Sequence, residues 1–330
     1  MFNKNLIELA EKIMEDDGFH ISSEEGRRLA ALPEAETINL IMCADKIRRK
    51  YKENRVFACS ITNAKSGLCT EDCAFCAQSA HHETGIETHP LLGVGELVAD
   101  ARRLCESGAT EYSMVTSGYA LTDQEMETIV RAAGMIKQET PLVLCSSLGV
   151  LTEERARQLR ESGVTSYHHN LETARSFFDQ VCTTHDYEED VQTARIAKAA
   201  GLRVCCGGIL GLGETWEQRV ELAVTLRELD VDSIPINFLN PIPGTRMGAR
   251  PLLSPMEALK SIALFRFINP RKDITICGGR EVTLRDLQAW IFTAGANGLL
   301  VGNYLTTQGR DIRADMAMIK DLGLVVEKGV

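Results

Sequence analysis

The sequence lacks the features that would place it in a membrane, in a secretory route or on nucleic acid. It has no apolar run near the roughly 20 residues that a membrane-spanning helix needs. Residues 1–18, MFNKNLIELAEKIMEDDG, mix acids and bases among apolar side chains, which is typical of neither a secretory signal nor a transit peptide. The formal net charge of −10 argues against nucleic acid as a partner. We therefore expect a cytoplasmic protein that acts without a membrane.

The sequence also lacks internal repeats, low-complexity tracts and linkers, so we expect one domain spanning residues 1–330. Hydrophobic residues make up 44% of the chain, which is enough for a large core and far from the composition of a disordered protein. The eleven cysteines occur without a signal sequence. They indicate a reducing compartment and metal or redox chemistry rather than disulfides.

Residues 1–51 are predicted to form a helical extension that caps the molecule or faces a second copy. Ser22 is expected to cap a helix, with Glu25 completing a capping box, and Pro33 then breaks the chain. A second helix is predicted to carry one apolar stripe of Ile38, Ile41, Ala44 and Ile47.

From residue 52 onward, strand-like runs alternate with helical segments such as Gly95–Ser107, Glu153–Ser162 and Trp216–Leu229, and Met316–Lys320 supplies a last helix. The eight strand candidates are Arg55–Ile61, Glu111–Thr116, Leu142–Ser146, Thr165–Asn170, Leu202–Ile209, Ser233–Leu239, Ile274–Cys277 and Gly298–Val301. Eight such units predict an α/β protein with a closed (β/α)8 TIM barrel in residues 52–330. A doubly wound open sheet is the alternative, because a sequence does not reveal closure.

Cys69, Cys73 and Cys76 form a Cys-x3-Cys-x2-Cys pattern just after the first predicted strand, at the end where barrel enzymes carry their chemistry. Three thiolates can hold a four-iron cluster and leave one iron open to a small molecule. The alternative is zinc, with His81 or His82 as fourth ligand. No second Cys-x2-Cys or Cys/His pair lies nearby, so the pattern favours iron and sulfur.

Two asparagines, Asn170 and Asn237, end the fourth and sixth predicted strands. Such amides can bind a flat polar group such as a urea, or they can satisfy neighbouring backbone. Their similar depth favours a ligand. The glycine-rich fifth strand permits a ligand to approach the backbone closely, and its spacing is not the G-x-G-x-x-G of dinucleotide folds.

Further cysteines lie on predicted strands. Cys145 is in the third and Cys277 ends the seventh, whereas Cys205 and Cys206 must face opposite sides of the fifth. A single buried cysteine is usually a small hydrophobe, but thiols on several strands of one barrel can converge on a second cluster. Cys43 and Cys105 are expected to be packing residues, and Cys59 and Cys182 stay open.

Several stretches together resemble the biotin synthase family, and they cover nearly the whole chain from about residue 20 onward. They are Cys59–Ala77, His169–Thr173, Cys182–Tyr187, Val204–Thr215, Pro235–Thr245 and Thr293–Thr307. The cysteine loop, with Phe75 before its last cysteine, is similar only to radical S-adenosylmethionine (SAM) enzymes in general. The PINFLNPIPGT and AGANGLLVGNYLTT stretches are more specific.

This resemblance implies sulfur insertion into dethiobiotin to give biotin. Cys69, Cys73 and Cys76 would hold a [4Fe-4S] cluster that cleaves SAM, and an auxiliary cluster would donate sulfur. The implied SAM contacts are Phe75, Asn170, Glu172 and Ile209; those of dethiobiotin are Asn170, Asn237, Thr306 and Thr307. A flavodoxin- or ferredoxin-type electron donor and a homodimer are implied as well.

The chain departs from the resemblance at the auxiliary cluster, which usually has three cysteine ligands and one arginine ligand. Two of the cysteines match Cys145 and Cys205, while the third position is Ser113 and the arginine position is Thr275. Cys277 lies two residues on, on the same face of its strand. We therefore expect a rebuilt cluster on Cys145, Cys205 and Cys277, completed by Cys59, Cys182, Cys206 or a non-protein sulfur. A four-iron type fits this count better than a two-iron type.

Another departure is Asp190, which occupies a position where some members place an arginine near the SAM carboxylate.

Two functions other than sulfur insertion stay open. One is a different radical SAM reaction, as in the hydrogenase-maturation enzyme or methylornithine synthase, and the other is a non-enzymatic iron–sulfur carrier.

Overall fold

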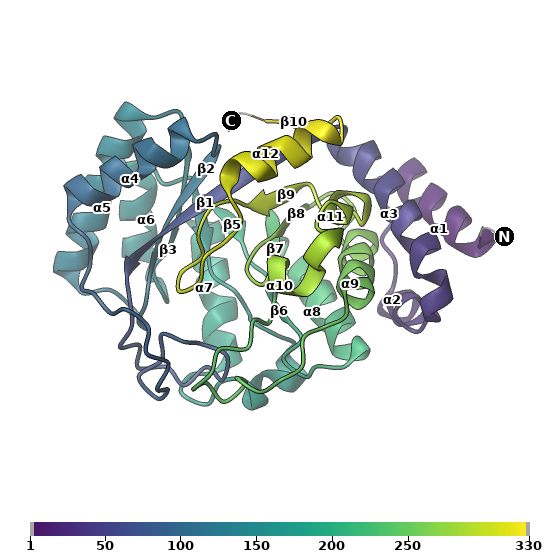
Figure 1. Ribbon diagram of the computed structural model, residues 1–330, viewed down its shortest axis with the longest axis horizontal. Coiled ribbons are helices and arrows are strands. Elements are labelled where there is room, and N and C mark those ends of the chain that lie inside the picture. The colour runs from purple at the N-terminus through teal and green to yellow at the C-terminus, as the bar shows by residue number, and fades with distance from the viewer. Residues whose placement is uncertain (1–2, 328–330) are drawn as a thin grey trace.

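The computed structural model describes residues 3–327, so the first two residues of the predicted extension and the last three of the predicted domain lie outside it. Its centre is a parallel sheet closed into a barrel (Figure 1). Around the barrel lie β1 (Arg55–Lys65), β2 (Glu111–Thr116), β3 (Val143–Ser147), β4 (Ser166–His168), β5 (Arg203–Cys205), β7 (Ser233–Phe238), β8 (Asp273–Ile276) and β9 (Gly298–Leu300). Because β9 pairs with β1, the predicted closed barrel is confirmed and the open sheet is excluded.

The fifth predicted strand is interrupted. It continues after Cys206 and Gly207 as β6 (Gly208–Leu210), which pairs with β7. A Cβ added at Gly207 would lie 2.0 Å from the carbonyl oxygen of Pro235, so only glycine allows the two strands to approach this closely. A last strand, β10 (Val325–Val326), which the sequence did not predict, pairs with β1 outside the barrel.

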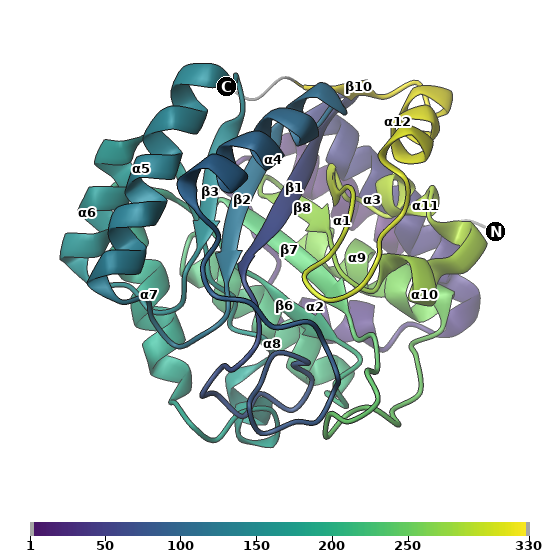
Figure 2. The ribbon, with the colours of Figure 1, turned by 60° about the vertical axis from the view of Figure 1, so that its left-hand side comes forward.

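Helices cover the outer face of the barrel (Figures 1 and 2). They are α4 (Val94–Glu106), α5 (Asp123–Glu139), α6 (Glu153–Ser162), α7 (Tyr187–Ala199), α8 (Trp216–Glu228), α9 (Pro255–Ile268), α10 (Arg280–Leu284), α11 (Trp290–Thr293) and α12 (Ile312–Asp321). Short 3-10 helices lie at Glu34–Glu36, Arg175–Gln180 and Arg285–Leu287. Capping boxes explain where several of these helices begin, for example at Thr122 before α5 and at Thr215 before α8. None of the helices in residues 3–327 has the length and apolar character needed to cross a membrane.

The N-terminal helices α1 (Lys4–Glu15), α2 (Ser23–Ala30) and α3 (Thr37–Lys52) pack outside α8 and α9 (Figure 1). The predicted capping box of Ser22 and Glu25 is present at the start of α2. The predicted apolar stripe on α3 is right for Ile41, Ala44 and Ile47, which are buried, and wrong for Ile38, which is exposed. Each three-residue step falls about 60° short of a full helical turn, so a stripe with that spacing drifts off the buried face.

The last helix, α12, is fixed to the barrel by a buried ion pair. Arg280 donates to both carboxylate oxygens of Asp315 at 3.0 and 2.7 Å, and both side chains are fully buried. The same arginine follows Gly278 and Gly279, which line the interior of the barrel. The pair therefore links the C-terminal helix to the wall of the barrel.

We predict that Asp315→Ala lowers the free energy of unfolding by about 3–5 kcal/mol, because it removes the buried carboxylate that binds the Arg280 guanidinium through two hydrogen bonds and leaves only the longer 3.4 Å contact with the partly exposed Glu281. Chemical denaturation of the purified variant measures this loss. Asp321→Ala, at the exposed end of the same helix, is the matched control and should stay within about 0.5 kcal/mol of the wild type. Equal stability of the two variants would contradict the prediction.

Candidate active site

A cavity of about 420 Å³ lies inside the barrel, within the size range of small-molecule sites. Twelve of the residues predicted from the sequence line it: Cys73, Phe75, Cys76, Cys145, Asn170, Glu172, Cys205, Ile209, Asn237, Cys277, Thr306 and Thr307. Cys69 lies outside this lining and is partly exposed on the same loop as Cys73 and Cys76. The strands thus bring side chains that are more than 200 residues apart in the sequence to one enclosed space.

The cysteine loop after β1 is held by its own backbone. The Cys69 amide donates to the Gln78 carbonyl at 3.0 Å, and the Cys76 amide donates to the Cys73 carbonyl at 2.9 Å. His81 and His82 each form a hydrogen bond through one ring nitrogen to a carbonyl of this loop, at 3.0 and 2.8 Å. These imidazoles therefore brace the loop, and the geometry gives the zinc alternative no support.

Two of the loop thiols, Cys73 and Cys76, are protonated in the metal-free protein. The contact with Cys182 and burial hold the pKa of Cys73 far above its usual value, and burial raises the pKa of Cys76 to about 11. Because thiolates are the metal ligands, iron must displace these protons when it binds. Three thiols on one short loop fit the donor set of an iron–sulfur cluster with an open iron.

A second group of thiols lies on the strands themselves. Cys59, Cys145, Cys205 and Cys277 all line the cavity, from β1, β3, β5 and the end of β8. Burial raises the pKa of Cys145 to about 11 and that of Cys277 to about 12. Burial also raises the pKa of Cys59 and of Cys205 well above the usual value, followed by repulsion from Glu111 for Cys59 and from Cys145 for Cys205. The structure thus adds Cys59, which the sequence left open, to this group.

The two other cysteines considered for this group lie elsewhere. Cys206 is fully buried in the hydrophobic core, because its side chain points away from the cavity as strand alternation requires. Cys182 lies next to Cys73, with 3.8 Å between the two sulfur atoms. Neither residue lines the cavity.

The space beside the strand thiols contains polar atoms without partners. The hydroxyls of Ser113 and Thr275, at the positions where the resemblance implies a cysteine and an arginine, are buried and form no hydrogen bond within residues 3–327. A buried hydroxyl without a partner costs free energy, so these atoms fit a polar group in the cavity. The imidazole of His168, which the sequence analysis missed, lies 3.4 Å from the Cys205 sulfur, and burial lowers its pKa to about 4.

Asn170 and Asn237 line the cavity and also bond to neighbouring residues. The Gly207 amide donates to the side-chain oxygen of Asn170 at 3.2 Å, and the Gly278 amide donates to that of Asn237 at 2.9 Å. Both predicted roles are therefore compatible with the geometry, because a carboxamide has two N–H groups and two acceptor lone pairs.

Glu172 has a strained backbone with φ of 60° and a carboxyl group inside the cavity. Its carbonyl oxygen accepts from the Ile209 amide at 2.8 Å and would lie 2.5 Å from a Cβ at Gly208. Burial and then repulsion from Asp190 raise the pKa of Glu172 to about 8. At neutral pH this group is largely a neutral acid that can both donate and accept a hydrogen bond.

Asp190 is enclosed by two histidines. Its carboxylate oxygens lie 2.7 Å from Nε2 of His169 and 3.4 Å from Nε2 of His185. Burial opposes its ionisation, but the hydrogen bonds from these two imidazoles hold its pKa below the usual value. The acid that replaces an arginine is therefore held by two histidines of the protein itself.

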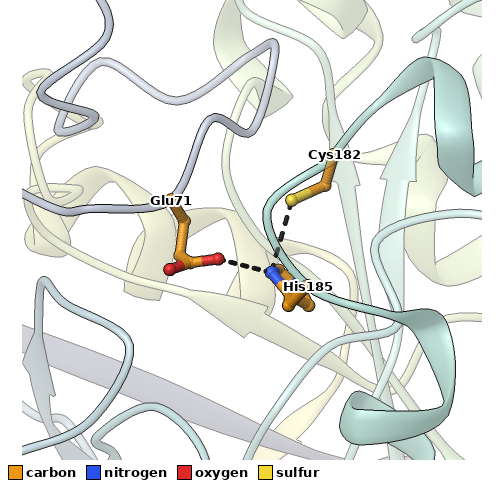
Figure 3. Close-up of side chains that lie close together, drawn as sticks. All are labelled: Glu71, Cys182 and His185. Carbon is orange, nitrogen blue, oxygen red and sulfur yellow. Dashed lines mark hydrogen bonds and ion pairs between the residues drawn. The ribbon is translucent and has the colours of Figure 1, made fainter.

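Glu71, Cys182 and His185 form a compact group beside the cysteine loop (Figure 3). One potential ligand atom from each lies within 4.8 Å of the others, so the group has the donors for a metal ion. Sequence reasoning did not select Glu71 or His185. The Cys-Thr-Thr-His run at residues 182–185 was the available signal.

The closed barrel and the three-cysteine loop define a radical SAM barrel protein, and comparison with known proteins agrees. Residues 65–226 match the Radical SAM superfamily, and residues 235–325 match the Biotin and Thiamin Synthesis associated domain. Among solved structures, methylornithine synthase superposes with a TM-score of 0.82 at 22% identity, covering 97% of both chains. A maturase of the [FeFe]-hydrogenase gives 0.82 at 18% identity, covering 98% of this chain and 76% of the other. At these identities the two structures support the fold alone.

Curated sequences are much closer. The chain is 59% identical over 312 residues to the biotin synthase of Syntrophus aciditrophicus, covering 94% of this chain and 96% of the relative. It is 53% identical over 325 residues to that of Geobacter metallireducens, covering 98% of both. The chain belongs to the biotin synthase family, as the resemblance predicted.

We predict that Glu172→Gln stabilises the iron-free protein near neutral pH and flattens its pH dependence. Because folding raises the pKa of Glu172 from 4.5 to about 8, the folded state binds more protons than the unfolded state between these values. Stability must then fall as pH rises from about 4.5 to about 8, and the neutral amide removes this loss. Melting temperatures across this range measure the effect.

Glu161→Gln on the exposed face of α6 is the control and should follow the wild type. If the Glu172→Gln curve parallels the wild type across the whole range, the buried carboxyl is not the group that titrates.

Proposed function

We propose that this chain makes biotin from dethiobiotin by radical SAM sulfur insertion. The observation that carries the proposal is a single cavity with two separate groups of thiols, one on a loop at the carboxyl ends of the strands and one on the strands. Two carboxamides, Asn170 and Asn237, line the same cavity. The family relationship supports the same reaction.

Cys69, Cys73 and Cys76 would hold the [4Fe-4S] cluster, and Cys145, Cys205 and Cys277 would hold the auxiliary cluster together with Cys59. When bound, the first cluster supplies the electron that splits SAM and the second supplies the sulfur. Four cysteines lining one part of the cavity, with small Ser113 and Thr275 beside them, support a four-iron auxiliary type.

The chain's own residues would bind and orient the organic molecules. Asn170 and Asn237 would form hydrogen bonds to the ureido ring of dethiobiotin, and Thr306 and Thr307 would lie near its tail. SAM would contact Phe75, Asn170, Glu172 and Ile209. The contribution of the barrel is to fix the reacting carbon near both sites and to exclude water.

We also propose the features that the family relationship implies for the whole protein. A flavodoxin- or ferredoxin-type donor would supply electrons, since the reaction needs a one-electron reductant.

Exposed Ile38 and Met42, one turn apart on α3, support a dimer-facing role for the N-terminal extension. The two matched regions contribute strands to the same barrel, which supports a single domain of residues 1–330. Eleven free thiols support a reducing, cytoplasmic location.

We predict that the protein, reconstituted anaerobically with iron and ³⁴S-sulfide, converts dethiobiotin to ³⁴S-biotin when SAM and a reductant are added. Mass spectrometry of the product measures the label. SAM cleavage without labelled biotin would indicate a different radical SAM reaction. Absence of SAM cleavage by a protein with full iron content would instead support a carrier.

We predict that Cys59→Ala lowers the iron and sulfide content of the auxiliary site and changes its Mössbauer signals, as does Cys277→Ala, because each removes a ligand. The matched control is Cys206→Ala, which removes a thiol that faces away from the cavity on the strand of Cys205. Unchanged auxiliary signals in Cys59→Ala would remove Cys59 from the ligand set, and the same result for Cys277→Ala would remove Cys277.

A further inference from the structure

The segment between β9 and α12 borders the part of the cavity where the tail of dethiobiotin would lie. We call residues 302–311, which contain no helix or strand, the tail loop. Its two ends are in contact, because a Cβ added at Gly309 would lie 2.0 Å from the carbonyl oxygen of Gly302. Compact loops with their ends close together are frequently functional. Four residues of the tail loop line the cavity: Tyr304, Leu305, Thr306 and Thr307.

One carboxylate outside the tail loop holds it at two points. The Tyr304 hydroxyl donates between the two carboxylate oxygens of Glu281, at 2.9 and 2.8 Å, and the Arg310 amide donates to one of them at 3.1 Å. Glu281 lies on α10, and its side chain is 25% exposed. From β1, the Asn63 side chain donates to the Leu305 carbonyl at 2.8 Å. The tail loop is therefore fixed to two different parts of the barrel wall.

The backbone connects Tyr304 to the two threonines. The Tyr304 amide donates to the Thr307 carbonyl at 3.0 Å, which closes a turn around Leu305 and Thr306. Any displacement of Tyr304 therefore also displaces Thr306 and Thr307. The bond between Tyr304 and Glu281 thus controls where these two hydroxyl groups lie.

The chain just before Glu281 fixes one of the two cavity asparagines. The Gly278 amide donates to the side-chain oxygen of Asn237 at 2.9 Å, and Gly278 lies only three residues before Glu281. Residues 278–281 thus contact Asn237 at one end and the tail loop at the other. This short stretch sets the distance between the amide that would bind the ureido ring and the hydroxyls that would lie near the tail.

We propose that Glu281 is a positioning residue that determines specificity for the length of the substrate's tail. It acts through Tyr304 and places Thr306 and Thr307 at a fixed distance from Asn237. The proposal rests on the proposed function, because it takes dethiobiotin as the substrate. A tail that is one methylene group shorter does not reach the two threonines, and one that is longer must displace the tail loop.

The test measures dissociation constants by isothermal titration calorimetry. The full chain is reconstituted anaerobically and saturated with SAM without a reductant, so that no turnover occurs. The ligands are dethiobiotin and two homologues whose tails are one methylene group shorter and longer. The proteins are the wild type, Tyr304→Phe, Glu281→Gln and the double variant. Tyr51→Phe is the matched control, because it removes a tyrosine hydroxyl that donates to the Ile13 carbonyl at 2.6 Å in the N-terminal extension.

We expect the wild type to prefer dethiobiotin over each homologue by about 10- to 200-fold, the range for one methylene group in a fixed pocket. Tyr304→Phe and Glu281→Gln should each bind dethiobiotin more weakly and lose most of this preference, because the released loop adjusts to either tail. The double variant should match Glu281→Gln, since both changes remove the same hydrogen bond. SAM affinity should stay unchanged in all variants, and Tyr51→Phe should match the wild type throughout.

Equal binding of the three ligands by the wild type overturns the proposal, and so does an unchanged preference in both single variants. A loss of affinity that is equal for the three ligands and for SAM would show a general structural role and also overturn it. If one single variant does not fold, the other decides. If neither folds, Asn63→Ala, which releases the tail loop at Leu305, decides, and an unchanged preference there overturns the proposal.

One result separates this proposal from the proposed function. A wild type that carries both clusters and SAM but binds none of the three ligands would refute the proposed function as well. The other outcomes leave that function standing.

Discussion

Closure of the barrel between β1 and β9 is the contact on which the arrangement of the site depends. Phe57 pairs with Gly298 and Cys59 with Leu300, so the first and last barrel strands run side by side. The Phe57 ring lies 2.5 Å from the point where a Cβ on residue 298 would lie, so a side chain there would displace that ring. Because this pairing encloses the interior, thiols from residue 59 to residue 277 line one space.

Enclosure also determines the chemistry of the thiols. In a space with little water the charged form of a group is disfavoured, so the pKa values of Cys145 and Cys277 lie at about 11 and 12. Such thiols stay protonated and pack as small apolar groups until a metal replaces their protons. The same desolvation keeps Glu172 largely neutral and His168 uncharged at neutral pH.

Several ionisable groups near the cysteine loop are paired with one another. Asp190 has a histidine on each side, and His185 lies between Asp190 and Glu71. This row of alternating carboxylates and imidazoles ends at the cysteine loop. Its hydrogen bonds stabilise the ionised, buried Asp190 near the site.

Sequence alone determined the local features of this protein. Strand-like runs that alternate with helical segments predicted the eight barrel strands, and the Cys-x3-Cys-x2-Cys spacing predicted the metal loop, because both patterns lie within short stretches of the chain. The position of Asn170 and Asn237 at the ends of two predicted strands selected them as candidate ligand-binding residues, and the family resemblance added the atypical auxiliary positions. The break between β5 and β6 was missed because it depends on how closely β7 approaches Gly207. The drift of the apolar stripe on α3 was missed because the predicted stripe was spaced every three residues, which falls short of a helical turn.

Only the tertiary structure decided which distant residues meet. It placed Cys59 with the strand thiols, Cys206 in the core and Cys182 beside Cys73, three outcomes that the sequence could not separate. The physical reason is that strand alternation specifies a side, inward or outward, while the level along the barrel axis and the contacts between loops depend on register and closure.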